Sequence, residues 1–238
     1  MHNLLILSRE SEEYRTLIEE AHLPGLSIFT EPNPGIDILF GETGLIKNVL
    51  ASLPALTWAQ TTSAGVEALM DPSLRRDYML TNARDVFGRL MSEYVFGYLL
   101  NHERGMFSRF ADQQAKHWNH TKPGVLYGKT LGLLGVGSIG VELARTAKFF
   151  GMNVHGYTRG GKSSTDVDLY FHGQDILKFA SGLDYLVSVL PNTPATKKIV
   201  NPDVLNALPR HALFMNVGRG STVDEPALVA ALNEHKIA

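Results

Sequence analysis

Three glycines at the spacing G-x-G-x-x-G are the strongest chemical signal in the sequence. The segment GVGSIG supplies Gly135, Gly137 and Gly140 between the apolar run TLGLL and an amphipathic segment, so the pattern predicts a strand, a tight turn and a helix. The first glycine permits the turn, the second lets backbone approach a pyrophosphate, and the third lets the helix pack on the strand. The first helical residues, Ser138 and Ile139, would offer free N–H groups to phosphate. We therefore predict a dinucleotide site, with a purely structural turn as the alternative.

The residue that ends the next strand indicates which dinucleotide is expected. An NAD site normally has Asp or Glu there, about 20 residues after the glycines. The corresponding position is Thr158, and Arg159 and Lys162 follow it. A carboxylate would repel the 2′-phosphate of NADP, whereas Arg and Lys attract it. We therefore expect NADP(H) in preference to NAD(H), with a solvated basic loop as the alternative interpretation.

The glycine turn lies in the second of two series in which strands and helices alternate. In the first series, strands are expected at NLLILS, LSIFTE, IDILFG and TWAQTT, with helices at SEEYRTLIEEAHL, capped by Ser11, and at LIKNVLASLPAL. In the second series, strands are expected at TLGLLG, NVHGYT, YLVSVL and ALFMNVG, with helices beginning near Ser138, Gln174, Pro202 and Asp224. Such alternation is typical of parallel sheets with helices on both faces. The sequence therefore predicts an α/β protein with two doubly wound parallel sheets.

A long helical segment separates the two series. Residues Met91–Trp118 predict one helix, with Gly97 and Gly105 inside it. Its first turns are almost entirely apolar, so they need cover from another domain or a second subunit. We place the domain change here, with residues 1–95 as one domain and residues 96–238, including the long helix, as the other.

Composition limits the classes of protein that fit. The chain has 238 residues, of which 44% are hydrophobic and 19% charged, as in soluble globular proteins. Its net charge of -2 predicts no electrostatic attraction to nucleic acid or to anionic membranes. The lack of cysteine excludes disulfides and thiolate metal sites, and no metal site is expected. No run reaches the roughly 18 apolar residues of a membrane helix, and the first apolar run is too short for a signal peptide. We expect a cytoplasmic protein.

Five segments, taken in order, resemble the D-isomer-specific 2-hydroxyacid dehydrogenases. They are TTSAGVEAL, NARDVFGRLMSEYVFGYLL, GKTLGLLGVGSIG, SVLPNTPATKKIVN and MNVGRGSTVDEPALVAAL. The run LPNTPAT and the basic residues after Thr158 look closest to the NADPH-using glyoxylate/hydroxypyruvate reductases of that family. The resemblance implies a flavodoxin-like substrate domain, a Rossmann domain, an active site between them, and a homodimer formed through the long helical segment.

The resemblance also implies a reaction and the residues that perform it. Family members transfer a hydride between the nicotinamide and C2 of a small 2-keto acid, which requires an anchored carboxylate, a polarised carbonyl oxygen and a delivered proton. By resemblance, backbone at Ala64 and Gly65 holds the carboxylate, and Arg219 is the catalytic arginine. Pro191 and Val217 are implied to lie near the cofactor. An ordinary strand-to-helix turn at Ala64 and a solvent-facing Arg219 are the alternatives.

The family's proton donor is a histidine supported by a glutamate, and the resemblance places both after the segment DEPALVAALNEHKIA. This sequence ends at Ala238, so neither residue is assigned, and none of its nine histidines is expected to replace the donor. We expect a fragment or truncated product whose Rossmann sheet lacks a strand, which binds cofactor but catalyses slowly. A non-catalytic NAD(P)-binding interaction protein and an inactive fragment are the alternative functions.

Overall fold

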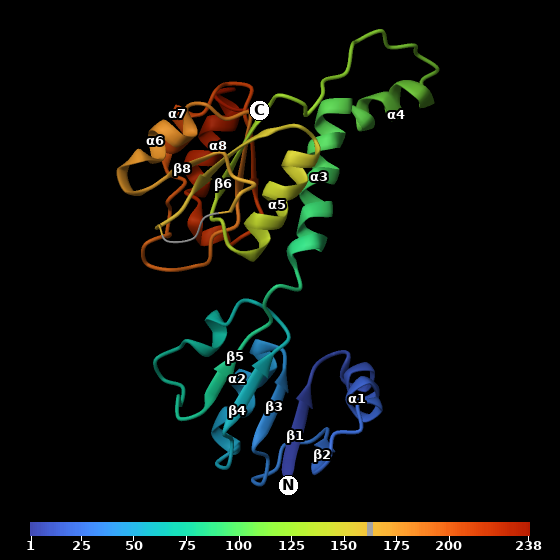
Figure 1. The fold of residues 1–238 in the computed structure, drawn as a ribbon, viewed down its shortest axis with the longest axis vertical. Coiled ribbons are helices and arrows are strands. Elements are labelled where there is room, and N and C mark those ends of the chain that lie inside the picture. The colour runs from blue at the N-terminus through green and yellow to red at the C-terminus, as the bar shows by residue number, and fades with distance from the viewer. Residues whose placement is uncertain (161–163) are drawn as a thin grey trace. The chain divides into compact units, whose positions relative to one another are not determined.

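The computed structural model describes residues 1–160 and 164–238. They form two compact units, Met1–Arg84 and Asp85–Ala238 (Figure 1). Each unit contains one parallel β-sheet of five strands among the described residues.

The first unit has the strand order of a flavodoxin-like fold. Its elements are β1 (His2–Leu7), α1 (Ser11–Glu20), β2 (Leu26–Phe29), β3 (Ile38–Gly41), α2 (Thr43–Val49), β4 (Trp58–Thr61) and β5 (Met79–Thr81), with 3-10 turns at Leu50–Ser52 and Glu67–Leu69. The order β2-β1-β3-β4-β5, with all neighbours parallel, is the flavodoxin-like order 2-1-3-4-5. The predicted fold is therefore confirmed. The predicted cap of α1 is wrong, because Ser11 is its first helical residue and Glu10 is its N-cap.

The second unit has the strand order of a Rossmann fold. Its strands are β6 (Thr130–Leu134), β7 (Asn153–Tyr157), β8 (Leu169–Phe171), β9 (Tyr185–Ser188) and β10 (Leu213–Asn216). Its helices are α3 (Gly88–Arg104), α4 (Met106–Gln114), α5 (Ser138–Phe149), α6 (Ile176–Ala180), α7 (Pro202–Ala207) and α8 (Glu225–Asn233), with 3-10 turns at Gly173–Asp175 and Gly220–Thr222. The parallel order β8-β7-β6-β9-β10 corresponds to 3-2-1-4-5 of the common Rossmann order. The predicted second fold is confirmed.

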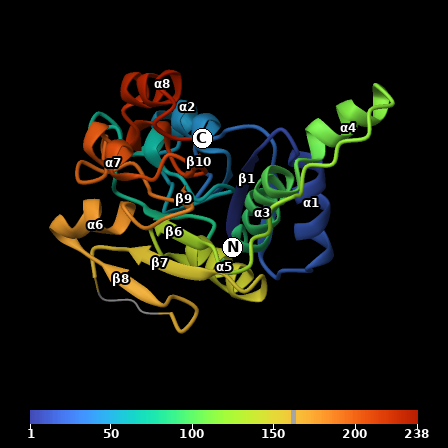
Figure 2. The same ribbon diagram turned by 90° about the horizontal axis from the view of Figure 1, so that it is seen from above.

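Apolar side chains cover both faces of this second sheet. Leu133, Val154 and Val187 belong to a core cluster with residues of α3 and α5. Leu134 and Leu186 belong to a second cluster with residues of α6, α7 and α8. Figure 2 shows these three helices and, on the other side of the strands, α3 and α5. Since helices occupy both faces, the ends of the strands are the places left for a ligand.

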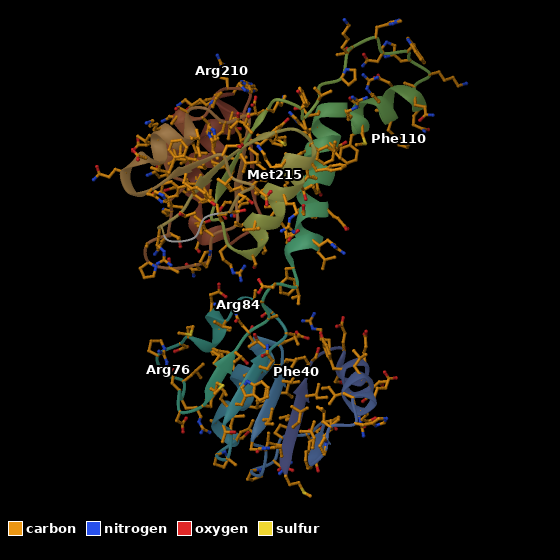
Figure 3. The ribbon with its side chains drawn as sticks, viewed as in Figure 1. Phe40, Arg76, Arg84, Phe110, Arg210 and Met215 are labelled. Atoms are coloured by element: carbon orange, nitrogen blue, oxygen red, sulfur yellow. The ribbon has the colours of Figure 1, made fainter. Side chains whose placement is uncertain are left out.

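The long helical segment is shorter than predicted. Helix α3 packs against α5 and belongs to the compact unit that begins at Asp85, while the domain boundary after residue 95 stays a prediction. The helix ends at Arg104, because Gly105 adopts a left-handed conformation with φ of 58° and donates its N–H to carbonyls of the last turn. The prediction of one helix to Trp118 is therefore wrong. None of the residues of the separate α4, all of them described, is buried, and Figure 3 shows Phe110 on this helix.

A buried ionic cluster joins α3 to the amino-terminal edge of the second sheet. The side chain of Glu103 is 6% exposed, and its Oε1 accepts a 2.8 Å bond from Nζ of Lys129 and another from the hydroxyl of Tyr185. Burial alone raises the pKa of Glu103, but these hydrogen bonds outweigh burial and hold the pKa below its ordinary value. Because Lys129 precedes β6 and Tyr185 begins β9, the cluster lies opposite the carboxyl edge.

Replacing Glu103 with alanine is expected to lower the free energy of unfolding by about 2–4 kcal/mol, because the buried hydroxyl of Tyr185 and the half-buried ammonium of Lys129 would lose their shared partner. Urea unfolding measures this change. Glu234→Ala is the control, since Glu234 pairs with Lys236 on the surface, and it is expected to cost less than about 0.5 kcal/mol. Equal losses in the two variants would contradict the assignment.

Candidate functional site

The carboxyl ends of the described strands in the second unit form one row. Register partners across the sheet are Phe171, Tyr157, Leu134, Ser188 and Asn216, and each of them ends its strand. The chain leaves this row at His172, Thr158, Gly135, Val189 and Val217. Because ligands of open α/β sheets bind outside this edge, the sheet brings most of the predicted site residues to one place.

The glycine turn has the geometry that its spacing predicts. Gly135 has a φ of 97°, which side chains other than hydrogen rarely allow, and its N–H donates to the carbonyl of Tyr157 at 3.0 Å. A Cβ on Gly140 would lie 2.4 Å from the carbonyl oxygen of Gly135, so only glycine permits this approach of α5 to β6. Gly137 is the N-cap of α5, and a Cβ there would meet nothing within 4 Å. The turn is tight on its inner side and open at Gly137.

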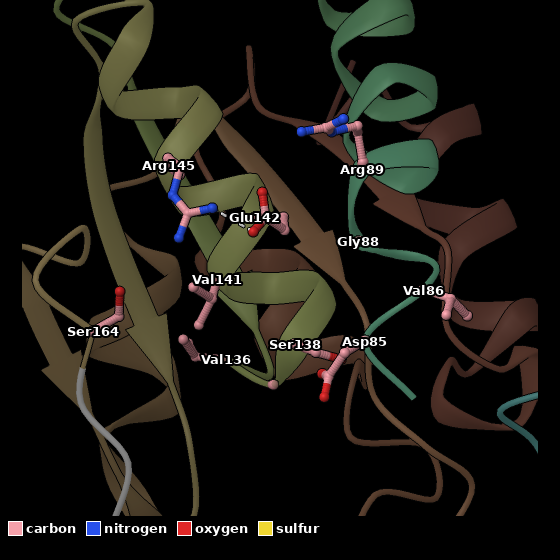
Figure 4. A pocket seen from close by; sticks show the side chains of 11 residues that line it. Asp85, Val86, Gly88, Arg89, Val136, Ser138, Val141, Glu142, Arg145 and Ser164 are labelled. Atoms are coloured by element: carbon pink, nitrogen blue, oxygen red, sulfur yellow. Dashed lines mark hydrogen bonds and ion pairs between the residues drawn. The ribbon is translucent and has the colours of Figure 1, made fainter. Parts of the chain in front are cut away.

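A pocket of about 900 Å³ opens beside this turn. Its lining residues are Asp85, Val86, Gly88, Arg89, Val136, Gly137, Ser138, Val141, Glu142, Arg145 and Ser164. Figure 4 shows Ser164 across the pocket from Val141 and Arg145 of α5. The guanidinium of Arg145 pairs with Glu142 at 2.5 Å, so these two charges largely offset each other. The predicted helix-start residue Ser138 lines the pocket, and Ile139 is half-buried beside it. The volume is within the range of pockets that bind cofactors.

The residues predicted to distinguish NADP from NAD lie in the segment after β7. The backbone N–H of Thr158 donates to the carbonyl of Phe171, and its Oγ1 accepts a 3.1 Å bond from the N–H of Gly160. Arg159, between them, is exposed. Lys162 lies outside the described residues. The described part of this segment is therefore a fixed turn that carries one exposed guanidinium.

Backbone contacts join the segments that follow β9 and β10. The N–H of Val217 donates to the carbonyl of Ser188 at 3.0 Å. A Cβ on Gly218 would lie 2.5 Å from the carbonyl oxygen of Leu190, so the two segments touch at Gly218 without intervening side chains. Pro191 is the residue directly after Leu190. Gly218 is not among the site residues predicted from the sequence, although its place in NVGRG beside Arg219 could have indicated it.

Arg219 lies just after β10, where the sequence places it. Its carbonyl oxygen accepts a 2.7 Å bond from Oγ1 of Thr222 and a 3.1 Å bond from Nδ2 of Asn216. Its side chain is half-buried, with Nη1 3.3 Å from the carbonyl oxygen of Gly218. These bonds fix the backbone of Arg219 at the carboxyl edge. A fixed backbone is needed where a side chain has to hold a ligand in one position.

In the first unit, side chains hold the loop at Ala64 and Gly65. Oγ1 of Thr61, at the end of β4, donates to the carbonyl of Ser63, and Nδ2 of Asn82 donates to the carbonyl of Ala64, both at 2.7 Å. Within the described residues, the N–H groups of Ala64 and Gly65 have no acceptor. The loop therefore presents two backbone donors. Asn82 was missed, because its contact with Ala64 depends on the pairing of β4 with β5.

The histidine of β7 is structural. Nδ1 of His155 is buried without a partner among the described residues. Burial lowers the pKa of His155, while the Asp168 carboxylate acts in the opposite direction. His102 precedes Glu103 on α3, at the edge opposite the glycine turn. In the described part of the chain, no three His, Asp or Glu residues are placed to hold a metal ion, and no helix there is long and apolar enough to cross a membrane.

Acid is expected to destabilise the second unit through His155. A histidine whose pKa is lowered by folding binds protons more readily in the unfolded chain, so the unfolding free energy decreases as pH falls below about 6.5. His155→Phe is expected to make this pH dependence shallower, as measured by urea unfolding at a series of pH values. An unchanged slope in the variant would assign the acid sensitivity to other groups.

A Rossmann unit with a G-x-G-x-x-G turn, preceded by a flavodoxin-like unit, defines a class of two-domain dinucleotide-binding proteins. Comparison with known proteins identifies the family within that class. The model of the D-isomer specific 2-hydroxyacid dehydrogenase NAD binding domain matches residues 96–238. The chain belongs to this family, and the predicted resemblance is confirmed.

Individual relatives agree with this assignment. A D-isomer specific 2-hydroxyacid dehydrogenase family protein from Aeromonas salmonicida is 38% identical, with a TM-score of 0.94 over 99% of this chain and 79% of that one. A relative from Xanthobacter autotrophicus, solved with NADPH, is 28% identical, with a TM-score of 0.85 over 99% of this chain and 78% of that one. Glyoxylate/hydroxypyruvate reductase A of Yersinia enterocolitica is 30% identical over 81% of this chain. The chain spans 64% of that reductase's length.

Proposed function

We propose that the protein transfers a hydride between NAD(P)H and C2 of a small 2-keto or 2-hydroxy acid of the glyoxylate or hydroxypyruvate type. The observation that carries this proposal is the glycine turn at the start of α5, closed at Gly140 and open at Gly137. That opening leaves room for a pyrophosphate, and the helix N-terminus favours its charge. In this proposal the second unit holds the coenzyme, and the first unit binds the substrate.

NADP(H) is the proposed coenzyme in preference to NAD(H). Thr158 stands where an NAD site has a carboxylate, and the exposed Arg159 follows it. A guanidinium would bind the 2′-phosphate through charge-assisted hydrogen bonds. The NADPH complex of the Xanthobacter relative supports this choice.

The substrate is proposed to bind through one group of backbone donors and one cation. The N–H groups of Ala64 and Gly65 would hold its carboxylate, as backbone donors suit an anion. The guanidinium of Arg219 would bind the carbonyl oxygen and stabilise the negative charge that develops there during hydride transfer. Pro191 and Val217 would contact the nicotinamide side of the coenzyme.

A homodimer formed through α3 and α4 is also proposed. Both helices expose aromatic side chains, namely Tyr94, Tyr98, Phe107 and Phe110, each at least half exposed. Exposed aromatic side chains on adjacent helices are typical of protein interfaces. Sedimentation equilibrium of the protein and of a variant with Phe107→Ser and Phe110→Ser would test this, with a shift to monomer expected.

Titration with NADPH and NADH, followed by the fluorescence of the reduced nicotinamide, tests the proposed function. We expect saturable binding of both coenzymes with a lower Kd for NADPH. Absence of binding to either would contradict the proposal. Coenzyme binding without conversion of glyoxylate or hydroxypyruvate would favour a non-catalytic NAD(P)-binding protein.

A further inference from the structure

The side chain of Tyr170 in β8 and that of His172, the residue directly after β8, bond to the backbone at Ser164 and Thr158. Nδ1 of His172 lies 2.9 Å from the carbonyl oxygen of Thr158 and 3.3 Å from its Oγ1. A carbonyl oxygen only accepts, so Nδ1 is the donor in the shorter contact. The hydroxyl of Tyr170 accepts a 2.7 Å bond from the N–H of Ser164. The end of β8 and the residue that follows it therefore hold Ser164 and Thr158.

The two holding side chains are themselves ordered as a pair. The rings of Tyr170 and His172 are parallel within 3°, with centroids 6.3 Å apart. Tyr170 is half-buried, and the strand that carries it pairs with β7 through Tyr157 and Phe171. The position of these rings is therefore determined by the sheet.

Both held residues lie at places that matter for the coenzyme. Thr158 occupies the position at which dinucleotide sites distinguish the ribose 2′ group, and its Oγ1 also accepts the N–H of Gly160, beyond Arg159. Ser164 lines the pocket that begins at Gly137 (Figure 4). Phosphate recognition depends on donors that are already in position, because ordering them on binding costs affinity.

We infer that Tyr170 and His172 are positioning residues for recognition of the 2′-phosphate, so that these two side chains at the end of β8 set the preference for NADP(H) over NAD(H). This inference rests on the proposed function and deepens its choice of coenzyme. The glycine turn, which would bind the part shared by both coenzymes, follows β6, with β7 lying between it and β8. Loss of the contacts made by Tyr170 or His172 should therefore weaken the binding of NADPH more than that of NADH.

Two conservative variants remove one contact each, and a third is the matched control. Tyr170→Phe keeps the ring and removes the hydroxyl that accepts from Ser164. His172→Phe keeps a flat ring and removes the N–H that donates to Thr158. Tyr157→Phe removes a hydrogen bond of the same kind between the same two strand ends, the 2.6 Å bond to the carbonyl of Gly173. The Kd values of NADPH and NADH are measured for the wild type and for each variant.

Each test variant is expected to bind NADPH about three- to tenfold more weakly, the effect of one lost hydrogen bond. The Kd of NADH should change less than about twofold, and this retained binding also shows that the variant is folded. The control Tyr157→Phe should keep the wild-type ratio of the two Kd values. Equal weakening of both coenzymes, or no weakening of NADPH, would overturn the inference while the proposed function stands. A wild type without preference for NADPH would overturn the inference together with the choice of coenzyme, and a wild type that binds neither would overturn the proposed function itself.

Discussion

Valine in place of Gly137 is expected to weaken NADPH binding by about a hundredfold or more while leaving the free energy of unfolding nearly unchanged. The backbone of Gly137 is extended, with φ of -88° and ψ of -160°, a conformation that valine readily adopts. A Cβ there meets no protein atom within 4 Å, so folding tolerates the side chain. The pyrophosphate would lose its close approach to the backbone and about two charge-assisted hydrogen bonds. Coenzyme titration and urea unfolding measure the two effects separately.

Two other glycines of the same unit provide controls for this prediction. Gly182 precedes β9 at the amino edge, and a Cβ there also meets nothing within 4 Å, so Gly182→Val should leave NADPH binding unchanged. Gly140→Ala should instead lower the unfolding free energy by about 1–3 kcal/mol, because its Cβ would press on backbone. Wild-type affinity in Gly137→Val would contradict the placement of the pyrophosphate.

Lysine in place of Arg219 is expected to lower kcat/KM for glyoxylate by about 10²–10³-fold while the Kd of NADPH stays within about twofold of the wild type. Lysine keeps the positive charge but loses the planar pair of donors that would bind the carbonyl oxygen and hold its developing charge. The backbone of Arg219 is fixed by Thr222 and Asn216, so the variant should keep the fold. Steady-state kinetics and coenzyme titration measure the two quantities.

Arg210→Lys is the matched control for Arg219, because Arg210 is an exposed arginine of the same unit that bonds only the carbonyl of His235 among the described residues. Its kcat/KM should stay within about twofold of the wild type. Comparable losses in the two variants would show that the effect of the substitution does not depend on the position of Arg219.

The sequence was sufficient for those features that depend on neighbours along the chain. The glycine turn combines a local spacing with a local hydrophobic pattern, and both sheets follow from the alternation of apolar runs with amphipathic segments. The end of α3 was missed because a glycine in the sequence can lie inside a helix or end it. Only the left-handed φ of Gly105 shows that it ends α3. Strands β5 and β8 were missed because three residues are too few to show a period.

Residues that act through distant contacts could not be predicted in this way. Asn82 bonds Ala64 and His172 bonds Thr158 only because neighbouring strands bring their ends together. Gly218 is recognisable as a close contact only when the segment after β9 is placed against it. Such roles depend on the order and register of the strands, which a pattern of residue types does not specify.

Mass spectrometry can show directly whether the protein transfers a hydride to a 2-keto acid, by detecting deuterium that moves to glyoxylate from NADPH labelled at C4 of the nicotinamide. This measurement detects even slow turnover and identifies the atom that receives the hydride. We expect one deuterium at C2 of glycolate, and we expect its rate of appearance to fall in Arg219→Lys. A protein that binds NADPH but leaves glyoxylate and hydroxypyruvate unlabelled would contradict the proposed hydride transfer.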